Sequence, residues 1–325
     1  MALMRHILFS YALSGDQRGQ ALSGPEIARL LRSDDLAWVH LDALDPGAAD
    51  WIAENVPYLD PHAVEALLAE ETRPRATPIG DGVLVFLRGV NLNEGADPED
   101  MVSIRLWIDP HRIISLQRRQ LKAVGDIVER IRAGQGPEDA GAFLSLLIER
   151  LTHRMEPLLR ALDDEADSLE EEVIDEASPA LRRPITEVRR RAITFRRYIA
   201  PQRDAVAALR DHPNDMLDDL DRRRLLESQD RLLRTIEDLD AIRERAQVVK
   251  DELAAALSDR QNQHLYFLSI VSAIFLPLGF LTGLMGINLG GMPGADSPNG
   301  FWLFVAGLLV VTGLSILWLR RIRRR

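Results

Sequence analysis

The spacing of apolar residues along the chain changes at about residue 140. Upstream, short apolar runs are separated by turn-rich pieces such as NEGADP, which is the pattern of strands. The predicted strands are residues 4–11, 36–41, 82–90, 101–108 and 112–116. A short helix is predicted at residues 61–70. The first 140 residues therefore predict a compact α/β domain.

Downstream, apolar residues recur at gaps of three and four, the pattern of helices that pack on one another. One such stripe runs through residues 144–173 and a second through 181–199, with Pro179 and Pro184 marking the turn between them. Residues 214–276 contain neither Gly nor Pro, and as one helix they would reach about 95 Å. We expect a helical domain over residues 141–264, ending in a stalk that packs against copies of itself.

The stalk leads without a break into the first of two apolar segments, residues 265–285 and 301–319. Each segment has about 20 residues, the length at which a helix crosses the ~30 Å hydrocarbon core of a membrane. Residues 320–325 carry five arginines, which the positive-inside rule places in the cytoplasm. The start of the chain shows no signal-peptide pattern. The sequence therefore predicts an α+β membrane protein with both termini cytoplasmic and an outer loop at residues 286–300.

Composition narrows the chemistry further. The 325 residues include no cysteine, which excludes a Cys-zinc site, an iron–sulfur cluster and a thiol nucleophile. The formal charge of −10 argues against general binding of nucleic acid. No phosphate loop, HExxH or GxSxG motif is present, and His40, His62 and His111 are scattered. We therefore expect neither an enzyme nor a bound cofactor.

Acidic residues crowd together between residues 163 and 176 with no basic residue among them. Such a surface can attract divalent cations, since carboxylates suit hard ions. The alternative, which we favour, is a solvated helix face that also pairs with arginines of the next helix. The two roles are compatible. The residues are Asp163, Asp164, Glu165, Asp167, Glu170, Glu171, Glu172, Asp175 and Glu176.

A second set of residues shares one face of the first apolar segment. Its small and hydroxyl side chains permit a water-filled path, and its leucines permit a dewetted constriction. The alternative is a small-residue helix interface that conducts nothing. The residues are Leu265, Ser269, Ser272, Leu276, Gly279 and Gly283.

The first apolar segment is followed by Gly286-Ile287-Asn288 and then LGGMPG. In this place the chain resembles the CorA superfamily of divalent-cation transporters, whose signature is Gly-Met-Asn. The Gly-Ile-Asn variant resembles the ZntB branch of zinc transporters. The resemblance extends over the whole chain, since WVHLDALDP, ETRPRATPIGDGVLVFLRGV, the long stalk, two spans and a basic tail follow in the family's order.

The resemblance implies a funnel-shaped homopentamer in the lipid of a bacterial inner membrane, with the long helix lining the pore. It implies Zn²⁺ transport that can couple to the proton gradient, with uptake favoured over efflux. Five copies of Asn288 would hold a hydrated cation at the mouth of the pore, although Asn is also a common helix cap. Asp296 would concentrate cations at the entrance, but the acidic position of the family is shifted here.

Zinc does not follow from ligand chemistry, because zinc favours Cys and His. An oxygen-lined pore suits hydrated Mg²⁺, Co²⁺ or Ni²⁺ equally, so a CorA-type magnesium or cobalt channel remains an alternative. His264, just before the first span, either titrates near neutral pH or anchors the helix at the interface. An alternative of another class is a membrane-anchored sensor or scaffold that transports nothing.

Overall fold

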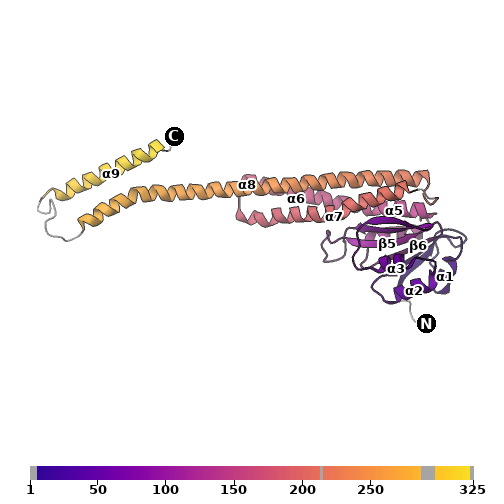
Figure 1. Cartoon of the computed structure of the whole chain (residues 1–325). Helices are drawn as coiled ribbons and strands as arrows, with labels where there is room; N and C mark the ends of the chain where they lie inside the picture. Colours follow the sequence, from indigo (N-terminus) through magenta and orange to yellow (C-terminus); the bar gives the residue numbers. More distant parts are fainter. Residues whose placement is uncertain (1–5, 213–214, 287–296, 323–325) are drawn as a thin grey trace. The chain divides into compact units, whose positions relative to one another are not determined.

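The computed structural model describes residues 6–212, 215–286 and 297–322 (Figure 1). The chain forms two compact units. The first comprises Met1–Glu176 with Ala180–Lys250, and the second comprises Ala177–Pro179 with Asp251–Arg325. The expected combination of an N-terminal α/β domain, a long helix and two apolar C-terminal helices is confirmed.

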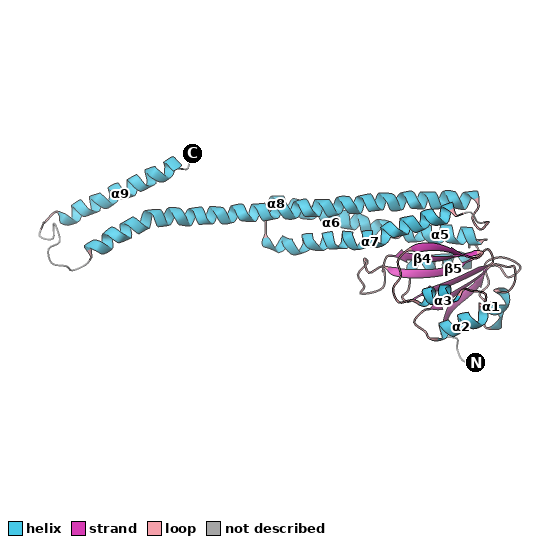
Figure 2. Cartoon of the chain, viewed as in Figure 1, coloured by secondary structure: helices cyan, strands magenta, loops and turns pink. Residues whose placement is uncertain are grey.

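The first unit is built on a six-stranded sheet with the order β1-β2-β6-β5-β4-β3 (Figure 2). All five predicted strands are present. Neighbouring strands are antiparallel except β2 and β6, which run parallel with Ala37 beside Arg112. The strands are β1 (Ile7–Ala12), β2 (Ala37–Asp42), β3 (Arg75–Ile79), β4 (Gly82–Gly89), β5 (Val102–Ile108) and β6 (Arg112–Gln117).

Alternating side chains of the strands supply two apolar faces. Val39 and Leu41 of β2 belong to a core cluster that includes residues of α1 (Pro25–Leu30), α2 (Gly47–Asn55) and α3 (Pro61–Leu68). Trp38 points to the other face and meets the ring of Phe143 edge-on at 4.8 Å. Phe143 lies on α5 (Ala140–His153), which follows α4 (Lys122–Arg132). The sheet is therefore covered by helices on both faces.

His40 lies beside Trp38 in this core and has a structural environment. Its Nδ1 is 2.7 Å from the hydroxyl of Ser115, and its ring stacks on Phe9. Burial lowers the pKa of His40 to about 4, because charging the ring would cost solvation free energy. The ring is therefore neutral at physiological pH.

The helical part begins with α6 (Glu156–Asp175) and α7 (Arg182–Asp211), joined through a short turn at Pro179–Leu181. Two further helices follow, α8 (Asp219–Met285) and α9 (Gly300–Ile322). The predicted stripes are buried, as Leu162, Phe195 and Leu239 show. The turn lies at Pro179 as the sequence predicts, but Pro184 lies in the first turn of α7, where a missing N–H costs no intrahelical hydrogen bond. Helix α8 is a single element that extends into the first apolar segment.

The N-terminus of α8 is fixed to α5. The carboxylate of Asp218 accepts the backbone N–H of Asp221 at 2.7 Å, which caps the helix. The side chain of Asp221 is itself buried, and it accepts the hydroxyl of Ser145 at 3.0 Å. A Cβ at Gly141 would collide with the Asp221 carboxylate, so only glycine permits this approach.

Candidate functional site

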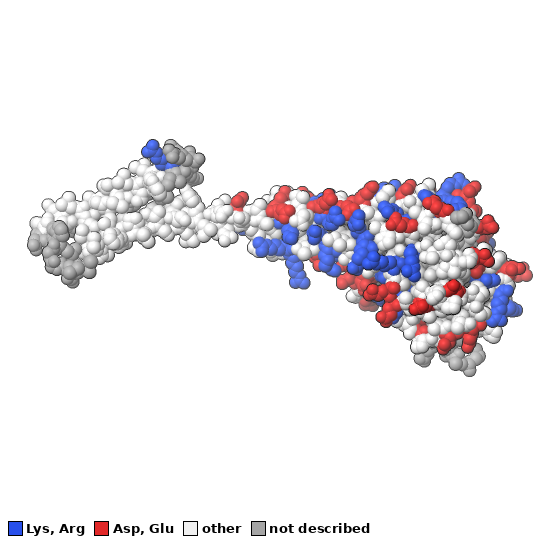
Figure 3. All heavy atoms as spheres, in the orientation of Figure 1, with Lys and Arg blue, Asp and Glu red and all other residues white. Residues whose placement is uncertain are grey.

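The apolar parts of α8 and α9 have no protein around them to bury their side chains. Both helices are long and apolar enough to cross a membrane. Phe275 is 67% exposed, Leu276 76% and Trp302 70%. Figure 3 shows charged side chains gathered over the first unit. The described residues between 261 and 318 include no Asp, Glu, Lys or Arg. Large apolar side chains exposed along the C-terminal part of α8 and along α9 require a lipid or protein environment.

Residues on α9 locate the edges of that environment. Phe301 and Trp302 lie at its start, with their rings edge-on at 5.5 Å, and Trp318 lies near its end. The two tryptophans are sixteen positions apart, about 24 Å along a helix. Aromatic side chains favour the interfaces of a bilayer, so this spacing fits one crossing.

The stripe predicted on α8 is an open face of the helix. Leu265 and Leu276 are both more than half exposed, and Ser269 and Ser272 are also exposed. A Cβ built at Gly279 or Gly283 meets no atom within 4 Å. The six stripe residues follow one another at gaps of four and three, so they share one side of the helix.

The hydroxyl groups along this helix differ in how they are satisfied. Ser269 donates to the carbonyl of Leu265 at 2.8 Å, and Thr282 donates to that of Leu278 at 2.9 Å. Ser272 makes no hydrogen bond within the described chain. A hydroxyl without a partner in hydrocarbon costs roughly 2–7 kcal/mol, so Ser272 needs water or a neighbouring helix.

The end of the stripe is described only in part. The N–H of Gly286 donates to the carbonyls of Thr282 and Gly283 at 3.0 and 3.1 Å, which closes the last turn. Ile287, Asn288 and Asp296, the other residues predicted at the pore mouth and entrance, lie outside the described residues. Their roles remain predictions from the motif.

The acidic run lies on α6 as far as Asp175. Its residues form ion pairs with two other helices of the same chain. Glu165 pairs with Arg191 of α7 at 2.6 Å, as the hairpin interpretation expects. Asp163 and Asp167 pair instead with Arg245 of α8. No group of three or more His, Asp or Glu suited to a metal ion is found in the part of the chain that the structure describes.

Sequence reasoning missed one row of acidic residues on α8. Asp230, Glu237 and Glu244 are exposed, and they lie opposite the seam through Leu232 and Leu239 that packs on the other helices. Their interval of seven residues continues in the sequence through Asp251 and Ser258 to Leu265, where the apolar stripe begins. Counting back in sevens from Leu265 would have found the row.

Comparison with known proteins identifies the family. A family model described as CorA-like Mg2+ transporter protein matches residues 33–321. The divalent cation transporter CmaX of Pseudomonas aeruginosa is 40% identical over 324 residues, which cover 98% of this chain and 97% of CmaX. The chain belongs to the CorA family. The structure of full-length CmaX agrees with this, with a TM-score of 0.85 and 98% of both chains covered.

Other members of the CorA family support the branch that the Gly-Ile-Asn variant indicates. The zinc transport protein ZntB of Pectobacterium carotovorum is 38% identical over 293 residues, covering 90% of this chain and 89% of ZntB. The predicted ZntB branch of the CorA superfamily is thereby confirmed. Because the CorA family is one of ion transporters, membership also agrees with the expectation that the chain is not an enzyme.

Proposed function

We propose that this chain transports divalent cations across a membrane as a homopentamer, with Zn²⁺ as its cargo. The observation that supports this most directly is the open stripe on α8. A single helix cannot enclose a path for an ion, but several copies arranged around one axis can. The relatives named CmaX and ZntB are transporters of divalent cations and of zinc, respectively.

The polar groups of the stripe favour its facing water rather than lipid. Ser272 has a free hydroxyl in the middle of the apolar segment, and the open positions at Gly279 and Gly283 leave room beside the backbone. Leu276 would form a narrow apolar ring between these wider levels, and Leu265 would form another at the cytoplasmic end of the stripe. Such rings can gate a pore by excluding water until ions and their hydration shells enter.

Ions would enter at the end of α8 that carries Gly286-Ile287-Asn288. Five amide oxygens of Asn288 would hold a hydrated cation through its water shell, with Asp296 raising the local cation concentration. On the cytoplasmic side, a ring of α8 helices would bring together five copies each of Asp230, Glu237 and Glu244. These rings of negative charge would draw cations away from the inner end of the pore.

The proposed orientation follows from the charges that flank the two spans. The arginine-rich tail after α9 favours the cytoplasmic side, and two crossings return the first unit to that side as well. The protein would then be a multi-pass protein of the inner membrane, with both termini in the cytoplasm. Import would be driven by the membrane potential and can couple to the proton gradient.

Magnesium is a second candidate cargo, because the matching family model is described as that of a Mg²⁺ transporter. The absence of cysteine is consistent with either ion, since a pore lined by oxygen atoms can pass hydrated cations. Zinc is favoured by the ZntB relatives.

Flux into liposomes that contain the purified chain tests the proposal. We expect Zn²⁺ to enter faster than Mg²⁺, and faster with an inward proton gradient than without one. The variant Asn288→Ala should reduce Zn²⁺ flux at least tenfold, because it removes the oxygen ring. Asn299→Ala, the same change just before α9, is the matched control and should keep wild-type flux.

Three results would overturn parts of this proposal. Preference for Mg²⁺ would replace the cargo, and equal rates with and without the proton gradient would remove the coupling. No divalent-cation flux above that of empty liposomes, from a folded oligomer, would favour a membrane-anchored sensor or scaffold.

A further inference from the structure

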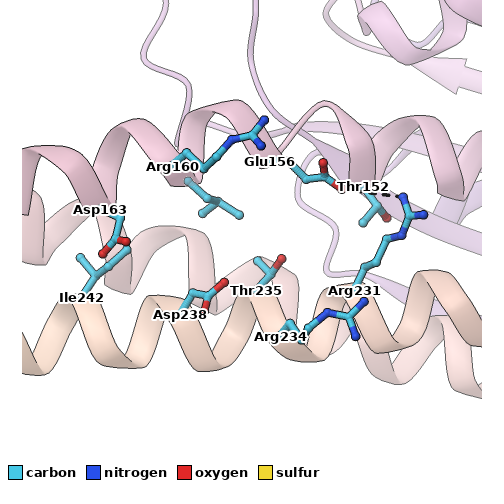
Figure 4. A pocket seen from close by; sticks show the side chains of 10 residues that line it. Thr152, Glu156, Arg160, Asp163, Arg231, Arg234, Thr235, Asp238 and Ile242 are labelled. Carbon is cyan, nitrogen blue, oxygen red and sulfur yellow. Dashed lines mark ion pairs between the residues drawn. The ribbon is translucent and has the colours of Figure 1, made fainter.

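A hollow lies between α6 and α8 of the first unit. Its volume is about 330 Å³, at the lower end of the range for sites that hold small molecules. Figure 4 shows α6 along one side of the hollow and α8 along the other. The residues that line it belong to these two helices and to the end of α5, so all of them lie in the first unit. The hollow is therefore complete within one copy of the chain.

The floor of the hollow combines apolar side chains with a hydroxyl group. Leu159 of α6 and Ile242 of α8 contribute buried apolar side chains. Thr235 also lines the hollow and is only 8% exposed, and Figure 4 shows its side chain pointing into the space. The hydroxyl of Thr235 has no hydrogen-bond partner among the residues that the structure describes. An acceptor atom placed in the hollow would satisfy this buried donor.

Six charged side chains line the hollow, and ion pairs within the chain account for three of them. Glu156 pairs with Arg231 at 3.7 Å, which Figure 4 marks with a dashed line. Asp163 pairs at 3.4 Å with Arg245, which lies outside the hollow. Two arginines and one carboxylate remain, and they make no ion pair within the described ranges. They are Arg160 on α6 and Arg234 and Asp238 on α8.

These three charges define which ligand would match the hollow. Each guanidinium group favours an acidic partner, because arginine binds carboxylates and phosphates through charge-assisted hydrogen bonds. Figure 4 shows Arg160 on the α6 side of the hollow and Arg234 on the α8 side. Asp238 points into the space from α8 and favours a cationic partner such as an ammonium group. Two positive charges against one negative charge match a ligand that carries the reverse.

We propose that this hollow binds a small zwitterion with two acidic charges and one amino group. Acidic amino acids such as L-glutamate have this pattern, and so do phosphorylated amines such as phosphoethanolamine. The acidic charges would contact Arg160 and Arg234, with one of their oxygen atoms accepting the Thr235 hydroxyl. The ammonium group would lie beside Asp238. Because such a ligand is not the transported ion, the inference goes beyond the function proposed above.

Titration calorimetry of the purified full chain in detergent tests the site with two probes, L-glutamate and phosphoethanolamine. We expect one molecule of at least one probe to bind per chain, and the probe that binds identifies the acidic group as carboxylate or phosphate. Arg160→Gln and Arg234→Gln should each weaken this binding at least about tenfold, because each removes a charged hydrogen-bond donor. Arg183→Gln is the matched control and should bind as wild type does. Arg183 is also exposed, but it lies on α7, which contributes no residue to the hollow.

Compounds without the amino group test the role of Asp238. Glutarate corresponds to L-glutamate in this way, and ethyl phosphate corresponds to phosphoethanolamine. The wild-type chain should prefer the amino compound, and Asp238→Asn should lose that preference, which a change in folding alone would not produce. A preference that survives in Asp238→Asn would overturn the placement of the amino group. No saturable binding of either probe, or wild-type affinity in both arginine variants, would overturn the site.

Discussion

Arg105 shows what a single buried charge does in this fold. It lies on β5 and is 1% exposed, and no carboxylate among the described residues pairs with it. Its guanidinium donates to the carbonyls of Leu67 at 3.0 Å and Glu70 at 3.1 Å, at the end of α3. Burial lowers the pKa of Arg105 to about 10. The side chain therefore stays charged while it satisfies carbonyls that the helix leaves open.

Replacing this side chain should unfold the first unit more easily. Arg105→Met keeps the apolar stem but leaves the two carbonyls without donors, so we expect a loss of about 2–4 kcal/mol in the free energy of unfolding. Arg118→Met is the control, because among the described residues Arg118 pairs with the exposed Glu70 alone, and it should lose less than about 1 kcal/mol. Denaturant titration of the whole chain in detergent, followed by circular dichroism, measures both. Equal losses would contradict the capping role.

Asp221 makes stability depend on pH. Burial raises the pKa of Asp221, so the folded chain binds this proton more tightly than the unfolded chain. The resulting stabilisation is present below the unfolded pKa and is lost as pH rises through the folded pKa. Asp221→Asn lacks this titration. We therefore expect the variant to gain stability relative to wild type between pH 3 and pH 7, measured as unfolding temperature. A constant difference across that range would contradict the assignment.

At the scale of elements, the sequence predicted the strands and helices whose apolar residues follow a clear local pattern. Strands such as β4 and β5 are nearly continuous apolar runs, and the helix seams follow a clear period. Strand β3 escaped because Pro78 interrupts it, and proline is tolerated there only because β3 lies at the sheet edge. Helix α4 contains Gly125, which weakens its local signal. The parallel pairing of β2 with β6 joins distant segments, which no local pattern contains.

The candidate site could likewise be predicted only where its residues follow a local pattern. The stripe on α8 could be read from spacing alone, because one helix period fixes which residues share a face. The acidic row at Asp230, Glu237 and Glu244 has the same kind of signal but continues at intervals of seven across a polar helix, where charge is common. The contacts of Glu165 and Asp163 with different helices depend on tertiary packing, so only the structure distinguishes them.

Helix α8 yields a prediction at its own scale. Gly283→Leu should reduce cation flux at least tenfold without dissociating the oligomer, because a large side chain would fill the space beside the backbone. Gly313→Leu is the matched control on α9, where an added Cβ also meets no atom within 4 Å. It should retain flux. Flux assays in liposomes and native mass spectrometry measure the two properties, and wild-type flux from a folded Gly283→Leu oligomer would show that this glycine lies away from the path.

At the scale of the whole molecule, the two units differ in burial and in charge. The first unit has a dense core, capped helices and most of the charge. The second unit has almost no internal burial in one copy and exposes its apolar side chains along two helices. Its proposed function therefore depends on lipid and on further copies of the chain.

The most direct test of the central claim asks whether one face of α8 touches water inside the membrane. Ser272→Cys places a single thiol on the stripe of a chain that has no other, and Ser315→Cys places one on α9. We expect a small water-soluble thiol reagent to abolish Zn²⁺ flux into liposomes through the Ser272→Cys protein and to leave the Ser315→Cys protein active. Block of the α9 variant alone, or undiminished flux through fully modified Ser272→Cys protein, would contradict a pore lined by α8.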